Sequence, residues 1–321
     1  MRLKSALRRG VAAAVIAGIV VSSGIPAYAA RWDIADGNIT VKAGDAEGTN
    51  RVTQGEKDVE DTDTVITGES EENTVTIDTS GGDVDVTFDD LKIDVSGKKE
   101  GDGSDDSPVQ ESKAAVTVQG DHDATIELDG DNELKSGGYN AGLEKNEHES
   151  KGTLTIKDDN DTKGSLTAEG GDGGGAGIGG GKESTGSSIT IRGGTIEAVG
   201  GSSAAGIGDG AGTEGREIDP DAPPSNPDNP NHIIISGDAE VEAKAGASTG
   251  GKTAAIGGGD VGEISNDALS DDDHKVTGGS LTRYDPDGKK MEGYSYDRRT
   301  PSQPEQPDDT ENSDDEDDAP D

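Results

Sequence analysis

The residues best suited to chemistry are short clusters of acidic side chains at turn-like segments. The segment KDDNDTKG carries Asp158, Asp159, Asn160 and Asp161, and comparable clusters occur in 89–94, 102–106 and 285–287. Calcium takes six to eight oxygen ligands from such side chains and from backbone carbonyls in bent loops. The EF-hand pattern is broken, because Lys163 stands where its ligand series would continue. We predict a Ca²⁺ site built on Asp158, Asp159 and Asp161, with simple turn formation as the alternative.

The glycine-rich segment GDGGGAGIGGGK at 171–182 has the composition of a phosphate-binding loop. The Walker pattern fails at both ends, because Ala176 replaces its first glycine and Glu183 replaces its hydroxyl residue. The looser Gly-x-Gly-x-x-Gly pattern needs a helix behind it, and the following KESTGSSITI alternates like a strand. We predict no nucleotide site here.

Aromatic side chains that could stack on sugar rings are scarce, with one Trp, one Phe and five Tyr in 321 residues. Trp32 and Tyr139 are the candidates for carbohydrate contacts. The alternative for Tyr139, in GGYNAG, is packing at a corner of the fold. Acidic side chains along one face could instead hold neutral sugar hydroxyls, or uronates through calcium.

The elements that would position these residues are short strands with one buried face. Apolar residues alternate with polar ones in VDVTFDD, LKIDVSG, TIEL, TLTIK, SITIRGG and AEVEAKAG, and glycine or aspartate pairs separate the runs. This pattern predicts strands of four to six residues and no helix in 31–284. The fold class is therefore all-β.

The strands recur as a repeat of about 29 residues. Its marker is an Ala-Gly-Ile-Gly step, with aliphatic anchors at Val116, Leu143, Ile178, Ile207 and Ile256. Leu143 precedes Leu154 by 11 residues, as Ile178 precedes Ile189. A unit with about three strands is one rung of a solenoid, in which stacked rungs bury a continuous aliphatic column. The glycines then have a structural role, because the backbone of each rung makes a tight turn at these positions.

Charge and targeting signals limit the partners. The net charge is −40, which disfavours nucleic acid as a partner. A basic start, the apolar run GVAAAVIAGIVV and the small residues of AYA predict a signal peptide over 1–29, with Ala30 as the new N-terminus. We expect a secreted or cell-surface monomer with no transmembrane span in the mature chain. The absence of cysteine excludes disulfides.

The expected organisation has five parts. A signal peptide occupies 1–29, an N-terminal cap segment 30–60, a parallel β-helix 61–284, a C-terminal cap segment 285–300 and a disordered acidic tail 301–321. The tail is rich in acids and proline and holds no lysine or arginine.

The succession of strands and Ala-Gly-Ile-Gly blocks over about 60–284 resembles the secreted bacterial carbohydrate-binding-domain proteins. These look like pectate lyases. The resemblance implies a right-handed parallel β-helix with about three short strands per rung. It also implies, for some members, bound calcium and affinity for plant polysaccharides with little or no lyase activity.

Three functions are open at this point. The first is a non-catalytic module, assisted by calcium, that binds a polysaccharide or a cell-surface glycan. The second is a diverged calcium-dependent polysaccharide lyase, which would gain support from an Arg or Lys facing an Asp cluster across adjacent rungs. The third is a structural adhesin or stalk. We favour a non-enzyme, because no histidine lies between glycines, no Arg-x-Lys follows a strand, and Arg192 stands where a strand meets a turn.

Overall fold

The computed structural model describes residues 28–99, 109–110, 112–160, 162–186, 188–212, 233–248, 253–259, 274–276 and 278–291. Within these ranges the chain is all-β, without an α-helix and with one 3-10 turn, η1 (Ile34–Asp36). Residues 1–27 of the predicted signal peptide, 292–300 of the predicted C-terminal cap and the whole acidic tail lie outside the described residues.

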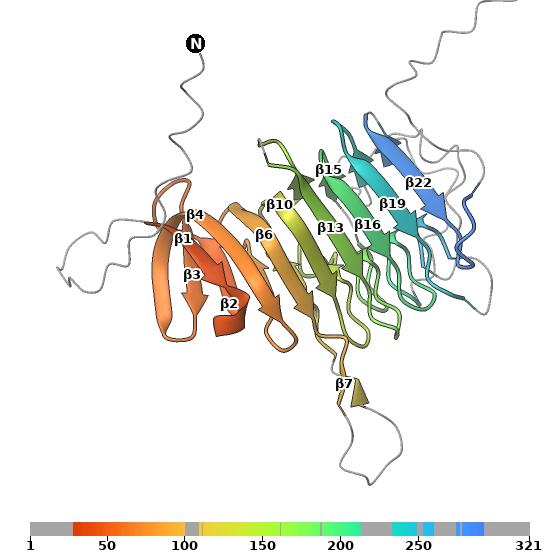
Figure 1. Cartoon of the computed structure of the whole chain (residues 1–321), viewed down its shortest axis with the longest axis horizontal. Helices are drawn as coiled ribbons and strands as arrows, with labels where there is room; N and C mark the ends of the chain where they lie inside the picture. Colours follow the sequence, from red (N-terminus) through yellow and green to blue (C-terminus); the bar gives the residue numbers. More distant parts are fainter. Residues whose placement is uncertain are drawn as a thin grey trace, which may run out of the picture.

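Most strands stack in parallel along one long axis, and the sheet nearly closes on itself as a solenoid (Figure 1). Three strand columns make up the body. The first column contains β5 (Val75–Asp78), β9 (Val116–Gln119), β11 (Leu143–Glu144), β14 (Ile178–Gly179), β17 (Ile207–Gly208) and β20 (Ile256–Gly257). The second contains β12 (Leu154–Lys157), β15 (Ile189–Ile191), β18 (Ile233–Ile235) and β21 (His274–Val276). The third contains β13 (Gly164–Glu169), β16 (Thr195–Val199), β19 (Glu240–Lys244) and β22 (Ser280–Tyr284).

The strand register confirms the repeat predicted from the sequence. Leu143 lies opposite Val116 and Ile178, and Ile207 lies opposite Ile178 and Ile256. All five anchors are at most 1% exposed. Each inward residue therefore stacks on its counterpart in the next rung, and together they form one aliphatic core.

Three strands are longer than the predicted four to six residues: β4 (Lys57–Ser70), β6 (Val84–Asp94) and β10 (Ala124–Lys135). β10 continues around a corner, since it pairs first with β12 in the second column and then with β13 in the third, and β6 pairs with β10 on both sides of that corner. The bend follows residues with positive φ, Asp90 at 54° and Gly130 at 65°. The Asp90 carboxylate accepts a hydrogen bond of 3.0 Å from the Asp131 amide in the next rung. VDVTFDD and LKIDVSG are thus one bent strand, where the sequence predicted two.

The N-terminal end is built differently from the rungs. The sequence predicted one clear strand in 30–60, whereas the structure has β1 (Tyr28–Asp33), β2 (Ile39–Ala43), β3 (Asn50–Gln54) and the start of β4 (Lys57–Ser70). β2, β3 and β4 form an antiparallel meander, and β1 pairs in parallel with β4. This meander lies at the red and orange end of the stack in Figure 1. A short two-stranded ribbon, β7 (Lys98–Lys99) with β8 (Val109–Gln110), projects from the body.

Candidate functional site

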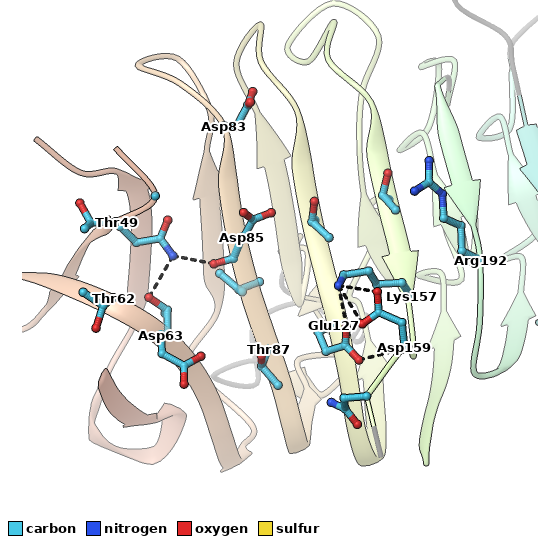
Figure 2. A pocket seen from close by; sticks show the side chains of 17 residues that line it. Thr49, Thr62, Asp63, Asp83, Asp85, Thr87, Glu127, Lys157, Asp159 and Arg192 are labelled. Carbon is cyan, nitrogen blue, oxygen red and sulfur yellow. Dashed lines mark hydrogen bonds and ion pairs between the residues drawn. The ribbon is translucent and has the colours of Figure 1, made fainter. Parts of the chain in front are cut away.

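An open polar groove of about 620 Å³ crosses β6, β10, β12 and the end of β15, beside the β3–β4 hairpin (Figure 2). We call it the polar groove. It contains no aromatic side chain. Its lining residues are Gly48, Thr49, Asn50, Thr62, Asp63, Thr64, Asp83, Asp85, Val86, Thr87, Thr125, Glu127, Thr155, Lys157, Asp159, Asn160 and Arg192.

The floor of the polar groove consists of two rows of outward side chains, because alternate residues of a strand face the same way. In the first row, Asp85, Thr125 and Thr155 lie in register on β6, β10 and β12. In the second row, Thr87, Glu127 and Lys157 lie in register on the same three strands. The inward residues between them, such as Ile126 and Ile156, are buried in the core. Adjacent members of a row are one strand spacing apart, about 4.8 Å.

Arg192 extends the second row by one rung. Its amide donates a hydrogen bond of 2.8 Å to the Ile156 carbonyl, which places it directly after β15 and beside Lys157. The Arg192 side chain is exposed and lines the same groove. Figure 2 shows it on the far side of Lys157 from Glu127.

Lys157 holds two carboxylates together in the second row. Its Nζ lies 2.9 Å from Glu127 Oε2 and 3.0 Å from both carboxylate oxygens of Asp159. Burial works against the charge of Lys157, but the hydrogen bonds that its ammonium donates to Glu127 and Asp159 outweigh this effect and raise the pKa of Lys157. The hydrogen bond from Lys157 lowers the pKa of Asp159. Lys157 is therefore a cation held between two carboxyl groups.

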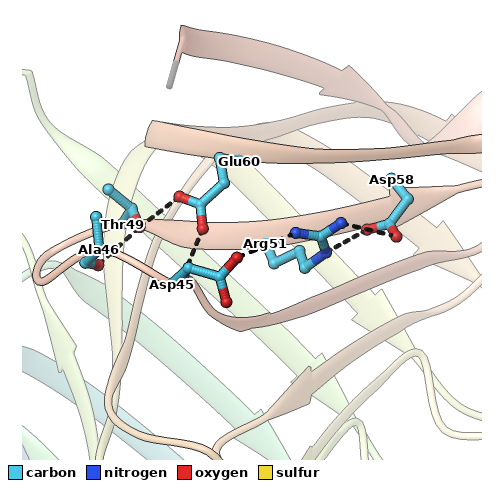
Figure 3. Close-up of polar contacts among 6 residues, drawn as sticks. All are labelled: Asp45, Ala46, Thr49, Arg51, Asp58 and Glu60. Atoms are coloured by element: carbon cyan, nitrogen blue, oxygen red, sulfur yellow. Dashed lines mark hydrogen bonds and ion pairs between the residues drawn. The ribbon is translucent and has the colours of Figure 1, made fainter. Parts of the chain in front are cut away.

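The edge of the polar groove is fixed by a second polar network (Figure 3). Glu60 on β4 accepts hydrogen bonds from the Asp45 amide and from Thr49 Oγ1, the latter at 2.9 Å. Arg51 on β3 makes two hydrogen bonds with Asp58, of 2.7 and 3.1 Å. These contacts hold the β2–β3 loop, from which Thr49 reaches the groove.

Asn50 joins this edge to the groove floor. Its Nδ2 donates to Thr64 Oγ1 at 2.9 Å and to the Asp85 carbonyl at 2.6 Å. Asn50 is 7% exposed, and its amide is used in these two hydrogen bonds. It therefore fixes the position of the hairpin against β6 and is not available to a ligand. The terminal meander and the rungs therefore form one continuous wall of the groove.

Of the three predicted calcium ligands, the structure describes Asp158 and Asp159, and each has a different partner. The Asp158 carboxylate accepts a hydrogen bond of 3.1 Å from the Gly164 amide and closes its own turn. Asp159 pairs with Lys157 in the polar groove, and Asp161 lies outside the described residues. Among the described residues, no group of three or more His, Cys, Asp or Glu side chains has the geometry to hold a metal ion. The calcium site stays a prediction.

Trp32 is not an exposed aromatic platform, in contrast to the role proposed from the sequence. It is 4% exposed, and its Nε1 donates a hydrogen bond of 2.7 Å to Asp61 Oδ2. Lys57 Nζ lies 5.8 Å from the centroid of its ring. A ring buried in this way has no free face to stack on a sugar.

Tyr139 is exposed, at 54% of its surface, as a sugar contact requires. However, Lys182 Nζ lies 4.9 Å from the ring centroid and takes one side of the ring. Tyr139 does not line the polar groove. Its role in carbohydrate binding stays a prediction, and a separate one from the groove.

Of the groove residues, Asp159 and Asn160 belong to an acidic cluster identified in the sequence and Arg192 was placed at the end of a strand, whereas the other lining residues were not predicted. The signal was present in the repeat: the outward positions of ATIEL and TLTIK carry Thr-x-Glu and Thr-x-Lys in equivalent places. The repeat that aligns the inward anchors also aligns these outward positions, with Thr125 beside Thr155 and Glu127 beside Lys157.

Comparison of the chain with protein-family models, with curated proteins and with solved structures found no match. In the part of the chain that the structure describes, no helix has the length and apolarity to cross a membrane.

Proposed function

We propose that this chain is a secreted, non-catalytic carbohydrate-binding protein that holds an extended polysaccharide in the polar groove. The observation that supports this most is the pair of parallel rows on the groove floor. Polar side chains follow one another there at the strand spacing, about 4.8 Å, and Thr125 and Thr155 present the same hydroxyl on two adjacent rungs. That spacing is close to the length of one pyranose unit in an extended chain. A periodic polymer can therefore make the same hydroxyl contact at Thr125 and at Thr155, on two adjacent rungs.

The groove chemistry favours a neutral polysaccharide. Its lining has five carboxylates, those of Asp63, Asp83, Asp85, Glu127 and Asp159, against the two cations Lys157 and Arg192. Carboxylates and threonine hydroxyls accept hydrogen bonds from sugar hydroxyls, and hydrogen bonds to charged groups are the stronger ones. With a net charge of −40 the protein repels polyanions unless a divalent cation bridges them.

The finer points of the fold belong to the same proposal. We propose a right-handed parallel β-helix of the kind implied by the resemblance to secreted carbohydrate-binding-domain proteins. Parallel strands joined by crossovers in one sheet take the right-handed path in nearly all proteins, which supports that hand. The basic start, apolar run and AYA site support export, so the ligand would be met outside the cytoplasm.

A retention experiment tests the function. The protein is incubated with insoluble neutral and uronate polysaccharides, with calcium and then with chelator, and the bound fraction is measured. We expect retention on a neutral glycan in both conditions and loss of retention in Thr125→Val/Thr155→Val. The matched control is Thr76→Val/Thr117→Val, a pair in register on β5 and β9 that does not line the groove. Retention unchanged in both variants would contradict binding in the groove.

One observation favours the lyase alternative. Lys157 faces Glu127 on the preceding rung and Asp159 on its own, with Arg192 one rung further, which is the arrangement expected of a lyase. Against it, the raised pKa of Lys157 keeps the amine protonated at neutral pH, whereas a general base must be free of its proton. Release of unsaturated uronates into the supernatants of the same experiment would establish the enzyme and overturn our proposal.

A further inference from the structure

The side chain of Asp61 is fully buried at the N-terminal end of the fold, on β4, and is 0% exposed. Oδ1 accepts hydrogen bonds of 3.1 Å from the amides of Ala30 and Asp63, and Oδ2 accepts one of 2.7 Å from Trp32 Nε1. All three donors are neutral. Two of them come from β1, the first described strand of the chain.

The buried carboxylate of Asp61 has no positively charged partner among the described residues. The nearby Lys57 has its Nζ over the Trp32 ring, 5.8 Å from the centroid. Buried charges in proteins are normally paired, because removing an ion from water costs several kcal/mol or more. Three neutral N–H donors reduce that cost without supplying the opposite charge.

One of the three donors coincides with the predicted cleavage point. The small-x-small site AYA ends at Ala29, so cleavage there makes the nitrogen of Ala30 the first atom of the mature chain. That nitrogen already lies 3.1 Å from Asp61 Oδ1 in the uncleaved chain. Ala30 is half-buried, so water reaches the site while the Asp61 side of it is enclosed.

We propose that Asp61 is the receptor for the α-ammonium group that processing of the Ala29–Ala30 bond creates. A signal-peptidase-type endopeptidase adds water across this amide. The C–N bond breaks, Ala29 leaves with a carboxylate, and the Ala30 nitrogen takes up a proton to become an ammonium. The neutral hydrogen bond to Asp61 then becomes a charge-assisted ion pair in a largely dry site, which is the stronger contact. Cleavage therefore locks β1 onto β4, independently of what the polar groove binds.

The first experiment measures the reactivity of the new amine. The full chain is exported from a bacterial host, its N-terminus is sequenced, and the processed protein is acylated at neutral pH and followed by mass spectrometry. We expect the chain to start at Ala30. We also expect its α-amine to react about tenfold more slowly than in Asp61→Asn, which is the effect of one pKa unit on the amine. A start at another residue, or equal rates, would overturn the proposal.

A second variant avoids loss of the buried carboxylate. Insertion of one serine between Ala29 and Ala30 leaves cleavage after Ala29, but it moves the ammonium one residue away from Asp61. All three original donors to Asp61 are retained, so this chain is expected to fold. Its α-amine should react at the rate of an exposed amine, and its urea midpoint should fall below that of the wild type. An amine as slow as that of the wild type, with an unchanged midpoint, would mean that Asp61 serves only Trp32 and the backbone.

Discussion

Replacing Gly179 by alanine tests whether the repeated glycines set the distance between rungs. Gly179 has a φ of +135°, and a Cβ placed on it would lie 2.0 Å from the carbonyl oxygen of Gly208 in the next rung. Because that oxygen is backbone, it can move away only if the rungs separate. Gly37 has almost the same φ, +138°, but a Cβ there would meet nothing within 4 Å. Gly37→Ala is therefore a control for backbone strain alone.

The difference between the two substitutions follows from these contacts. Unfavourable φ costs on the order of 1–3 kcal/mol at either position. At Gly179 the new methyl group is also overpacked, which costs about 1–3 kcal/mol more. Moving the Gly208 carbonyl would further weaken the hydrogen bond of 2.8 Å that it accepts from the Gly180 amide. We expect Gly179→Ala to lower the free energy of unfolding by about 2–4 kcal/mol more than Gly37→Ala does.

The assay is urea unfolding of both variants followed by far-UV circular dichroism. The fluorescence of Trp32, the single tryptophan, reports separately on the N-terminal end of the fold. This matters because one end of a stacked fold can unfold while the other rungs stay folded. Equal losses in the two variants would refute the reasoning, because they would show that the close approach of Gly208 does not constrain position 179.

Three further predictions concern the core, a buried amine and calcium. Ile191→Ala should lower the free energy of unfolding by about 2–5 kcal/mol, and Ile234→Ala, at an outward and half-buried position, by less than half as much, both measured in urea. Burial lowers the pKa of Lys145 to about 8. Because the unfolded chain then binds more protons, the free energy of unfolding should rise between about pH 8 and pH 10, and Lys145→Met should abolish that rise. Calorimetric titration should show Ca²⁺ binding that Asp158→Asn weakens, and no heat beyond that of dilution would contradict the predicted site.

The residues that point into the core could be predicted from the sequence, because equivalent positions in every rung pack against the same kind of neighbour. A residue at the Ile178 position has to fill the column between Leu143 and Ile207, so the sequence repeats an aliphatic residue there. Glycine recurs beside it because only a residue without a side chain fits between close rungs. These constraints act on residue types, and they can be read directly from the sequence.

The residues that point outward, including those of the polar groove, were harder to predict, because core packing does not restrict their residue types. Thr155 and Lys157 become part of one groove only when β12 is placed in register with β10. The same holds for Trp32, which packs in the core and donates its indole hydrogen bond to Asp61, a residue 29 positions further along the chain. Exposure of an aromatic residue near a chain end cannot be judged from its neighbours in sequence.

Binding affinity for a neutral oligosaccharide in the polar groove tests the central claim most directly. The measurement compares the dissociation constants of the wild type, Thr125→Val/Thr155→Val and the control Thr76→Val/Thr117→Val. Loss of two hydroxyl contacts of about 1 kcal/mol each should weaken binding at least tenfold in the groove variant, with the control unchanged. Equal affinity in all three proteins would show that the two rows do not hold the ligand.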